Sequence, residues 1–100
     1  MKISIILVAL LCSLSANTQA QDAAKGREKF VSCTACHGSQ GQGGVGPKLQ
    51  GQPAEVIVQK LTTYKNKGQI GPQSQLMWSM AGALSADDIK NIAAYTTILK

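Results

Sequence analysis

The sequence has few of the residues that usually build a large core or a metal site. Its 100 residues include four aromatic side chains, three cysteines and one histidine. A structural zinc site needs four soft ligands, but Cys12 lies in a leader-like segment, and the rest of the chain has only two cysteines and one histidine. The chain also lacks a basic stripe with interleaved aromatic residues, which argues against nucleic-acid binding. A small chain with so few large side chains usually needs a covalent link, a metal or a cofactor to stay folded.

The first 20 residues have the pattern of a cleaved signal peptide. Lys2 supplies the positive charge, and the apolar run over residues 3–12 is too short to span a bilayer comfortably. Residues 18–20 (TQA) place small side chains where a signal peptidase cuts. We therefore expect one mature domain over residues 21–100, exported to a bacterial periplasm. An uncleaved membrane anchor is the alternative.

One short segment carries most of the chemical information. Residues 33–37 spell C-T-A-C-H, which is the pattern C-x-x-C-H. Two thiols at this spacing can add to the vinyl groups of a porphyrin, and the next imidazole can reach the iron. The pattern predicts haem c bound covalently through Cys33 and Cys36, with His37 as an axial ligand of the iron. Zinc sites and redox dithiols also use C-x-x-C. This sequence lacks the four soft ligands of a zinc site, and the glycine-rich stretch after His37 does not look like the strand and helix that flank a redox dithiol.

Three segments with helical periodicity predict an all-α fold. They cover residues 22–35, residues 53–67 and the stretch from Ser85 to the end. Their boundary residues are Asp22, Pro53, Gly68 and Ser85, and Asp88 completes a capping pattern with Ser85. The core-facing positions are Ile57, Leu61 and Tyr64, then Ile89, Ile92, Ala93, Thr96 and Leu99, with Tyr95 and Ile98 on the flank.

Two long loops, 38–52 and 69–82, separate these helices. The first contains six glycines, yet it lacks the Lys-Ser/Thr that would follow in a phosphate-binding loop. A loop that wraps closely past a flat ligand explains the glycines better. Long loops in a compact domain usually have a function, and here both would wrap the cofactor. The predicted fold is three main helices and two long loops around one covalently bound haem.

The second axial ligand of the iron must come from a residue other than histidine, because His37 is the only one. The predicted mature chain has two methionines, Met77 and Met80, both in the second loop. A thioether ligand would give a closed, six-coordinate electron carrier. A labile sixth position would instead favour catalysis or sensing, and rapid carbon monoxide binding would identify it. On this reasoning either methionine can be the ligand.

These motifs together resemble those of small bacterial class I cytochromes c, including the halves of dihaem periplasmic cytochromes. The resemblance covers residues 24–99. It rests on C-x-x-C-H, on G-P-K-L and G-Q within residues 46–52, and on M-x-x-x-A-x-x-L-S-x-x-D-I-x-x-I-A-A-Y over 77–95. It implies the cytochrome c fold and an electron carrier that is not an enzyme.

The resemblance also assigns roles to single residues. It implies that Met77, eight positions before Ser85, is the sixth ligand, with Met80 as the alternative. It implies that the carbonyl of Pro47 accepts the proton on the free ring nitrogen of His37. Gly26 and Phe30 would pack against Tyr95 where the first and last helices cross. Trp78 departs from the family, which more often has a small residue there.

The implied partners are redox proteins that donate and accept electrons, with no small-molecule substrate and no nucleic acid. The sequence carries 10 Lys and Arg against 5 Asp and Glu. Lysines such as Lys48 near the haem edge would steer the protein to an acidic docking surface. The alternative function is a dedicated electron-transfer subunit of a periplasmic dehydrogenase or a sulfur-oxidising enzyme complex.

Overall fold

The structure is a computed structural model that describes residues 21–100, all of whose regular elements are helical. The predicted leader, residues 1–20, lies outside the described residues. The elements are α1 (Ala23–Phe30), the 3₁₀ turn η1 (Val31–Cys33), α2 (Thr34–His37), α3 (Ala54–Lys65), α4 (Ser74–Gly82) and α5 (Ala86–Thr96). The predicted all-α class is confirmed. Across residues 21–100, no helix is both long and apolar enough for a membrane span.

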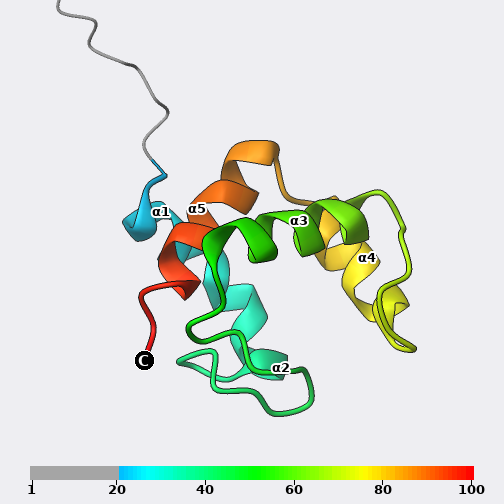
Figure 1. The fold of residues 1–100 in the computed structure, drawn as a ribbon, viewed down its shortest axis with the longest axis horizontal. Coiled ribbons are helices and arrows are strands. Elements are labelled where there is room, and N and C mark those ends of the chain that lie inside the picture. Colours follow the sequence, from blue (N-terminus) through cyan, green and yellow to red (C-terminus); the bar gives the residue numbers. More distant parts are fainter. Residues whose placement is uncertain (1–20) are drawn as a thin grey trace, which may run out of the picture.

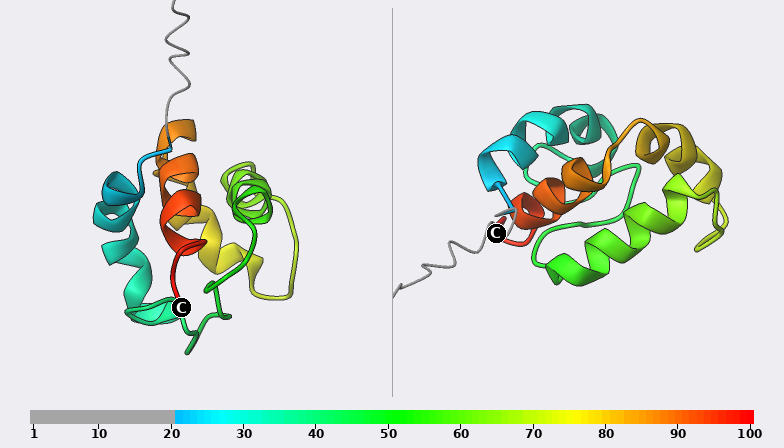
Figure 2. Two further views of the ribbon diagram at one scale, coloured as in Figure 1. Left: turned by 60° about the vertical axis from the view of Figure 1, so that its left-hand side comes forward. Right: turned by 90° about the horizontal axis from the view of Figure 1, so that it is seen from above.

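Helices α1 and α5 cross at close range, and α3 lies on the other side of α5 (Figures 1 and 2). A Cβ atom at Gly26 would lie 1.9 Å from the carbonyl oxygen of Asn91, so this crossing has room for glycine alone. The backbone N–H of Asp22 donates to the Asn91 side chain at 2.9 Å and ties the start of α1 to α5. The predicted contact between Phe30 and Tyr95 is confirmed, whereas the backbone nearest to Gly26 belongs to Asn91 and Ile92.

A small core forms where these helices meet the end of the chain. Phe30, Ile92 and Leu99 are its buried centre. The half-buried residues packed against them are Cys33, Leu49, Leu61, Leu84 and Tyr95. All five predicted core positions from Ile89 to Leu99 are buried, and so is Ile57, while Leu61 and Tyr64 are half-buried. Ile98 is 61% exposed, so its predicted place on the flank of the core was wrong.

The first predicted helix, 22–35, changes pitch before the two motif cysteines. Asp22 caps it as predicted, because its side chain accepts hydrogen bonds from the N–H groups of Ala24 and Lys25. The α-helix ends at Phe30, and a 3₁₀ turn leads into the short helix α2, which runs on to His37. Such turns are common where an α-helix ends, because their hydrogen bonds tighten the last turn. The motif thus lies on a tight turn followed by one helical turn.

Helix α3 ends in a Schellman motif in which a lysine takes the place usual for glycine. Lys67 has a φ of 59°, in the left-handed region that disfavours side chains with a Cβ. The N–H of Gly68 donates to the carbonyl of Thr63 at 2.8 Å, and that of Lys67 to Tyr64 at 2.9 Å. The helix therefore ends near Gly68 as predicted, with the left-handed residue one position earlier.

The second predicted loop, 69–82, contains a helix, so the expected extended backbone there was wrong. Helix α4 covers Ser74–Gly82 and packs along α3 (Figure 1). The Ser74 hydroxyl accepts from the N–H groups of Ile70 and Gly71 at 2.8 Å and closes the turn that leads into α4. The sequence pattern did not predict this helix, because its exposed residues include the apolar Leu76 and Met80. The helix therefore has no clear polar face.

Candidate functional site

The two motif cysteines lie one helical turn apart, and both are free thiols. Cys33 ends η1 and is half-buried, whereas Cys36 lies in α2 and is exposed. Burial raises the pKa of the Cys33 thiol. This effect is larger than that of the hydrogen bond with Ser32, which lowers the pKa. Residues three apart on a helix share a face, so the two sulfurs can serve neighbouring points on one ligand edge.

His37 is buried, and its ring is oriented by a backbone carbonyl. Its Nδ1 atom lies 2.8 Å from the carbonyl oxygen of Pro47. A carbonyl can only accept a hydrogen bond, so in the neutral ring Nδ1 carries the proton. The lone pair is then on Nε2, which is the nitrogen available to a metal. The implied contact between His37 and Pro47 is therefore present in the structure.

The glycine-rich loop, residues 38–52, packs against His37. A Cβ atom at Gly46 would lie 2.7–3.1 Å from three atoms of the His37 ring, so the loop can pass here only as glycine. The N–H of Gly46 donates to the Cys36 carbonyl at 2.7 Å, and that of Gly43 to the His37 carbonyl at 2.7 Å. These bonds satisfy two of the last carbonyls of α2, which a helix end leaves without partners.

The residues present fit a covalently attached haem. Two free thiols at the required spacing precede an imidazole whose metal-binding nitrogen is free. A carbonyl behind that imidazole fixes its tautomer and strengthens it as a ligand. The same donor set does not fit zinc, because residues 21–100 contain no group of three or more His, Cys, Asp or Glu that could hold a metal ion.

Both candidate methionines lie on α4, three positions apart. Met77 is half-buried, and Met80 is 41% exposed. Both methionines therefore lie on one helix. That helix is a different segment of the chain from the one that carries the cysteines and His37. In Figure 1, α2 lies below α3, and α4 lies at the lower right, beside the C-terminal end of α3.

Sequence reasoning missed three hydrogen bonds, made by two side chains, that fix α4. The indole Nε1–H of Trp78 donates to the carbonyl of Gly68 at 3.0 Å, and the ammonium of Lys65 donates to the carbonyls of Gly82 and Leu84. These contacts join residues 10 to 19 positions apart. No local pattern predicts them, although the bulky Trp78 at a position expected to be small was a signal.

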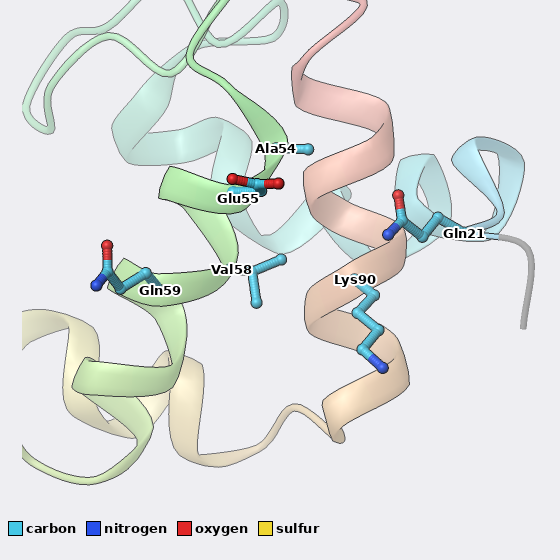
Figure 3. Close-up of a pocket in the computed structure, with 6 residues that line it drawn as sticks. All are labelled: Gln21, Ala54, Glu55, Val58, Gln59 and Lys90. Carbon is cyan, nitrogen blue, oxygen red and sulfur yellow. The ribbon is translucent and has the colours of Figure 1, made fainter.

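A surface groove between α3 and α5 lies apart from this site (Figure 3). Its volume is about 610 Å³. The residues that line it are Gln21, Ala54, Glu55, Val58, Gln59 and Lys90. None of these is a cysteine, histidine or methionine, so the groove supplies no ligand for a haem iron.

Comparison with known proteins agrees with the motif reading. A family profile described as Cytochrome c matches residues 23–98. The chain is 42% identical over 78 residues to Cytochrome c-554(548) of Halomonas halodenitrificans, which covers 76% of this chain and 94% of that protein. It is 40% identical over 91 residues to Cytochrome c-554(547) of Halothiobacillus neapolitanus, covering 81% and 100%. The Thiosulfate dehydrogenase electron acceptor of Stutzerimonas stutzeri is 35% identical over 66 residues, covering 63% and 30%.

Proposed function

The chain belongs to the cytochrome c family as a small class I member, and we propose that it shuttles single electrons between redox proteins in the periplasm. Its relatives are cytochromes c, which carry electrons and are not enzymes. Membership implies one covalently bound haem c with iron, and Cys33, Cys36 and His37 fit the attachment motif. The bound haem supplies an iron that alternates between the ferrous and ferric states.

In this proposal Cys33 and Cys36 form the thioether links, and His37 binds the iron through Nε2. The observation that carries it is the 2.8 Å contact between His37 Nδ1 and the Pro47 carbonyl. Such a partner orients the ring and raises its basicity as a ligand. Gly46 supports the arrangement, because any side chain there would displace the ring.

We assign the sixth ligand to Met77 and keep Met80 as the alternative. Two observations support Met77: the resemblance to the family favours this position, and Met77 is the less exposed of the two methionines. A thioether opposite an imidazole raises the reduction potential and closes the iron to other ligands. Such a closed site suits a carrier that makes and breaks no substrate bond.

Spectra of Met77→Ala and Met80→Ala test this assignment directly. The oxidised parent should show a sulfur-to-iron charge-transfer band, and only Met77→Ala should lose it. Loss of the band in Met80→Ala alone would move the ligand to Met80. A parent protein that is colourless and has the mass of the bare peptide would refute haem binding itself.

The proposed electron-transfer partner presents an acidic surface. Lys48 is exposed and follows Pro47 directly, so its charge lies beside the residue that orients His37. Long-range attraction of this kind weakens as salt screens it. The rate of electron transfer with an acidic redox protein should therefore fall as ionic strength rises, and Lys48→Gln should make it fall less. A rate that does not change with salt would contradict the steering role.

A second candidate is a dedicated subunit of an oxidoreductase complex, such as a dehydrogenase or sulfur-oxidising enzyme. The observation that favours it is the relative named as a thiosulfate dehydrogenase electron acceptor. Co-purification with one enzyme at fixed stoichiometry would support the subunit. Purification as a separate protein that reduces several partners would support the free carrier.

Export is part of the proposal, because a c-type haem is attached outside the cytoplasm. Residues 1–20 have the sequence pattern of a signal peptide. The purified protein should therefore begin at Gln21. A periplasmic fraction without the haem protein, or a protein that keeps residues 1–20, would contradict this part of the proposal.

A further inference from the structure

Helix α4, which carries both methionines, depends on α3 for its position. Within the described residues, α3 is the one helix against which α4 packs extensively. Ala81 is fully buried, whereas Leu76 on the same helix is 66% exposed. A helix of nine residues is too short to be stable alone, so its contacts with α3 decide where it lies.

The first polar contact of α4 with the α3 segment comes from Trp78. Its indole N–H reaches the carbonyl of Gly68, 3.0 Å away. That carbonyl belongs to the Schellman motif, whose own hydrogen bonds hold Gly68 to Thr63. The residue that supplies the acceptor is therefore also held by a hydrogen bond that does not involve Trp78. Trp78 follows Met77 directly, so on a helix the two side chains point about 100° apart.

The second contact comes from Lys65, the last residue of α3. Its ammonium donates to the carbonyl of Gly82 at 3.2 Å and to that of Leu84. The Gly82 carbonyl belongs to the last residue of α4, where helices leave acceptors unpaired and carry partial negative charge, and Leu84 lies two residues beyond it. A cation there completes the end of the helix. Trp78 and Lys65 thus hold α4 at its middle and at its end.

We propose that Trp78 and Lys65 are positioning residues that keep the methionine of α4 on the haem iron. This inference rests on the proposed function, because it needs a sulfur ligand from α4. Trp78 fixes the rotation of the helix one residue after Met77, and Lys65 stops its end from swinging away from α3. Together they set how readily another ligand can replace the sulfur.

The test uses the oxidised holoprotein and imidazole as the competing ligand. Trp78→Phe keeps an aromatic ring but removes the N–H, and the apparent affinity for imidazole should rise about 2- to 10-fold, the value of one net hydrogen bond. Imidazole binds the fraction of molecules with the sulfur released, so its affinity reports that fraction. Lys65→Met should act in the same direction from the other end of α4. It also keeps the test possible if Trp78→Phe does not fold.

The matched control is Asp22→Ala, which removes the cap of α1 far along the chain from α4. It should lower thermal stability as much as Trp78→Phe while leaving imidazole affinity unchanged. Equal imidazole affinity in the parent, Trp78→Phe and Lys65→Met would overturn the inference. An equal gain in imidazole affinity in Trp78→Phe, Lys65→Met and Asp22→Ala would also overturn it, because such a gain would reflect general destabilisation. If the parent itself lacks the sulfur-to-iron band, the proposed ligation fails instead.

Discussion

The rings of Phe30 and Tyr95 meet edge to face, with their centroids 5.4 Å apart and their planes at 63°. Phe30 is 1% exposed and belongs to the small central core. Phe30→Ala should therefore lower the free energy of unfolding of the holoprotein by about 3–5 kcal/mol. Denaturant unfolding followed by circular dichroism measures it. Val31→Ala is the control, because Val31 is 68% exposed and its truncation should change stability by about 0.5 kcal/mol or less.

Gly46→Ala should disturb the bond between His37 and Pro47. The new Cβ would lie 2.7 Å from Cε1 of the ring, so the imidazole must move. A weaker bond to the carbonyl makes the ring a weaker donor to ferric iron, and the reduction potential should rise. Potentiometric titration measures this change. Gly44→Ala is the matched control. Its Cβ would meet a single atom, the carbonyl oxygen of Cys36 at 3.3 Å, and would not approach the His37 ring. Equal potentials in the two variants would contradict the prediction.

Lys67→Gly should stabilise the protein. The native lysine has a φ of 59°, which costs a residue with a Cβ more than it costs glycine. After the extra chain entropy of glycine is subtracted, the gain should be about 0.5–1 kcal/mol in the free energy of unfolding. Thermal unfolding tests this. Lys90→Gly, inside α5, should instead cost about 1 kcal/mol, because glycine is a poor helix former. A loss in both variants would refute the strain at Lys67.

The capping box of α5 should make stability depend on pH. The backbone N–H of Ser85 donates to the Asp88 carboxylate at 2.9 Å and lowers the pKa of that group, with Lys29 adding a weaker attraction at 3.8 Å. The carboxylate therefore stabilises the fold above its unfolded-state pKa of about 3.9. That contribution is lost as the pH falls through the lower, folded-state pKa.

Asp88→Asn isolates this effect, because an amide keeps an acceptor oxygen but cannot ionise. At neutral pH the variant should be less stable by about 0.3–1 kcal/mol, the usual value of a carboxylate at a helix N-terminus. The difference should shrink as the pH is lowered below about 3.9. Thermal melts of parent and variant across this range measure it. A difference that stays constant with pH would show that ionisation of Asp88 is not the cause.

The parts of the fold that the sequence predicted well have local causes. Asp22 and Ser85 cap their helices through residues two or three positions away, and such pairs are visible in a sequence. The buried face of α5 repeats at helical spacing and was predicted residue by residue. The attachment motif lies within five consecutive residues, so no tertiary contact was needed to find it.

The parts that it missed depend on contacts between distant residues. Helix α4 lacks a strong cap of its own and has apolar residues on its exposed side, so its pattern reads as irregular. Hydrogen bonds from two side chains hold it in place. Trp78 donates to the carbonyl of Gly68, and Lys65 donates to the carbonyl of Gly82. Neither partner can be chosen before α3 and α4 are known to be neighbours. The pitch change before Cys33 is likewise absent from the helical pattern of residues 22–35.

The placement of the cysteines on η1 and α2, and of the methionines on α4, divides the attachment of the cofactor between two kinds of bond. Under the proposed ligation, the first segment is joined permanently by carbon–sulfur bonds, and the second by a coordinate bond that can open and close again. A molecule that releases its sulfur therefore keeps its prosthetic group, and it can recover its original state without any assembly machinery.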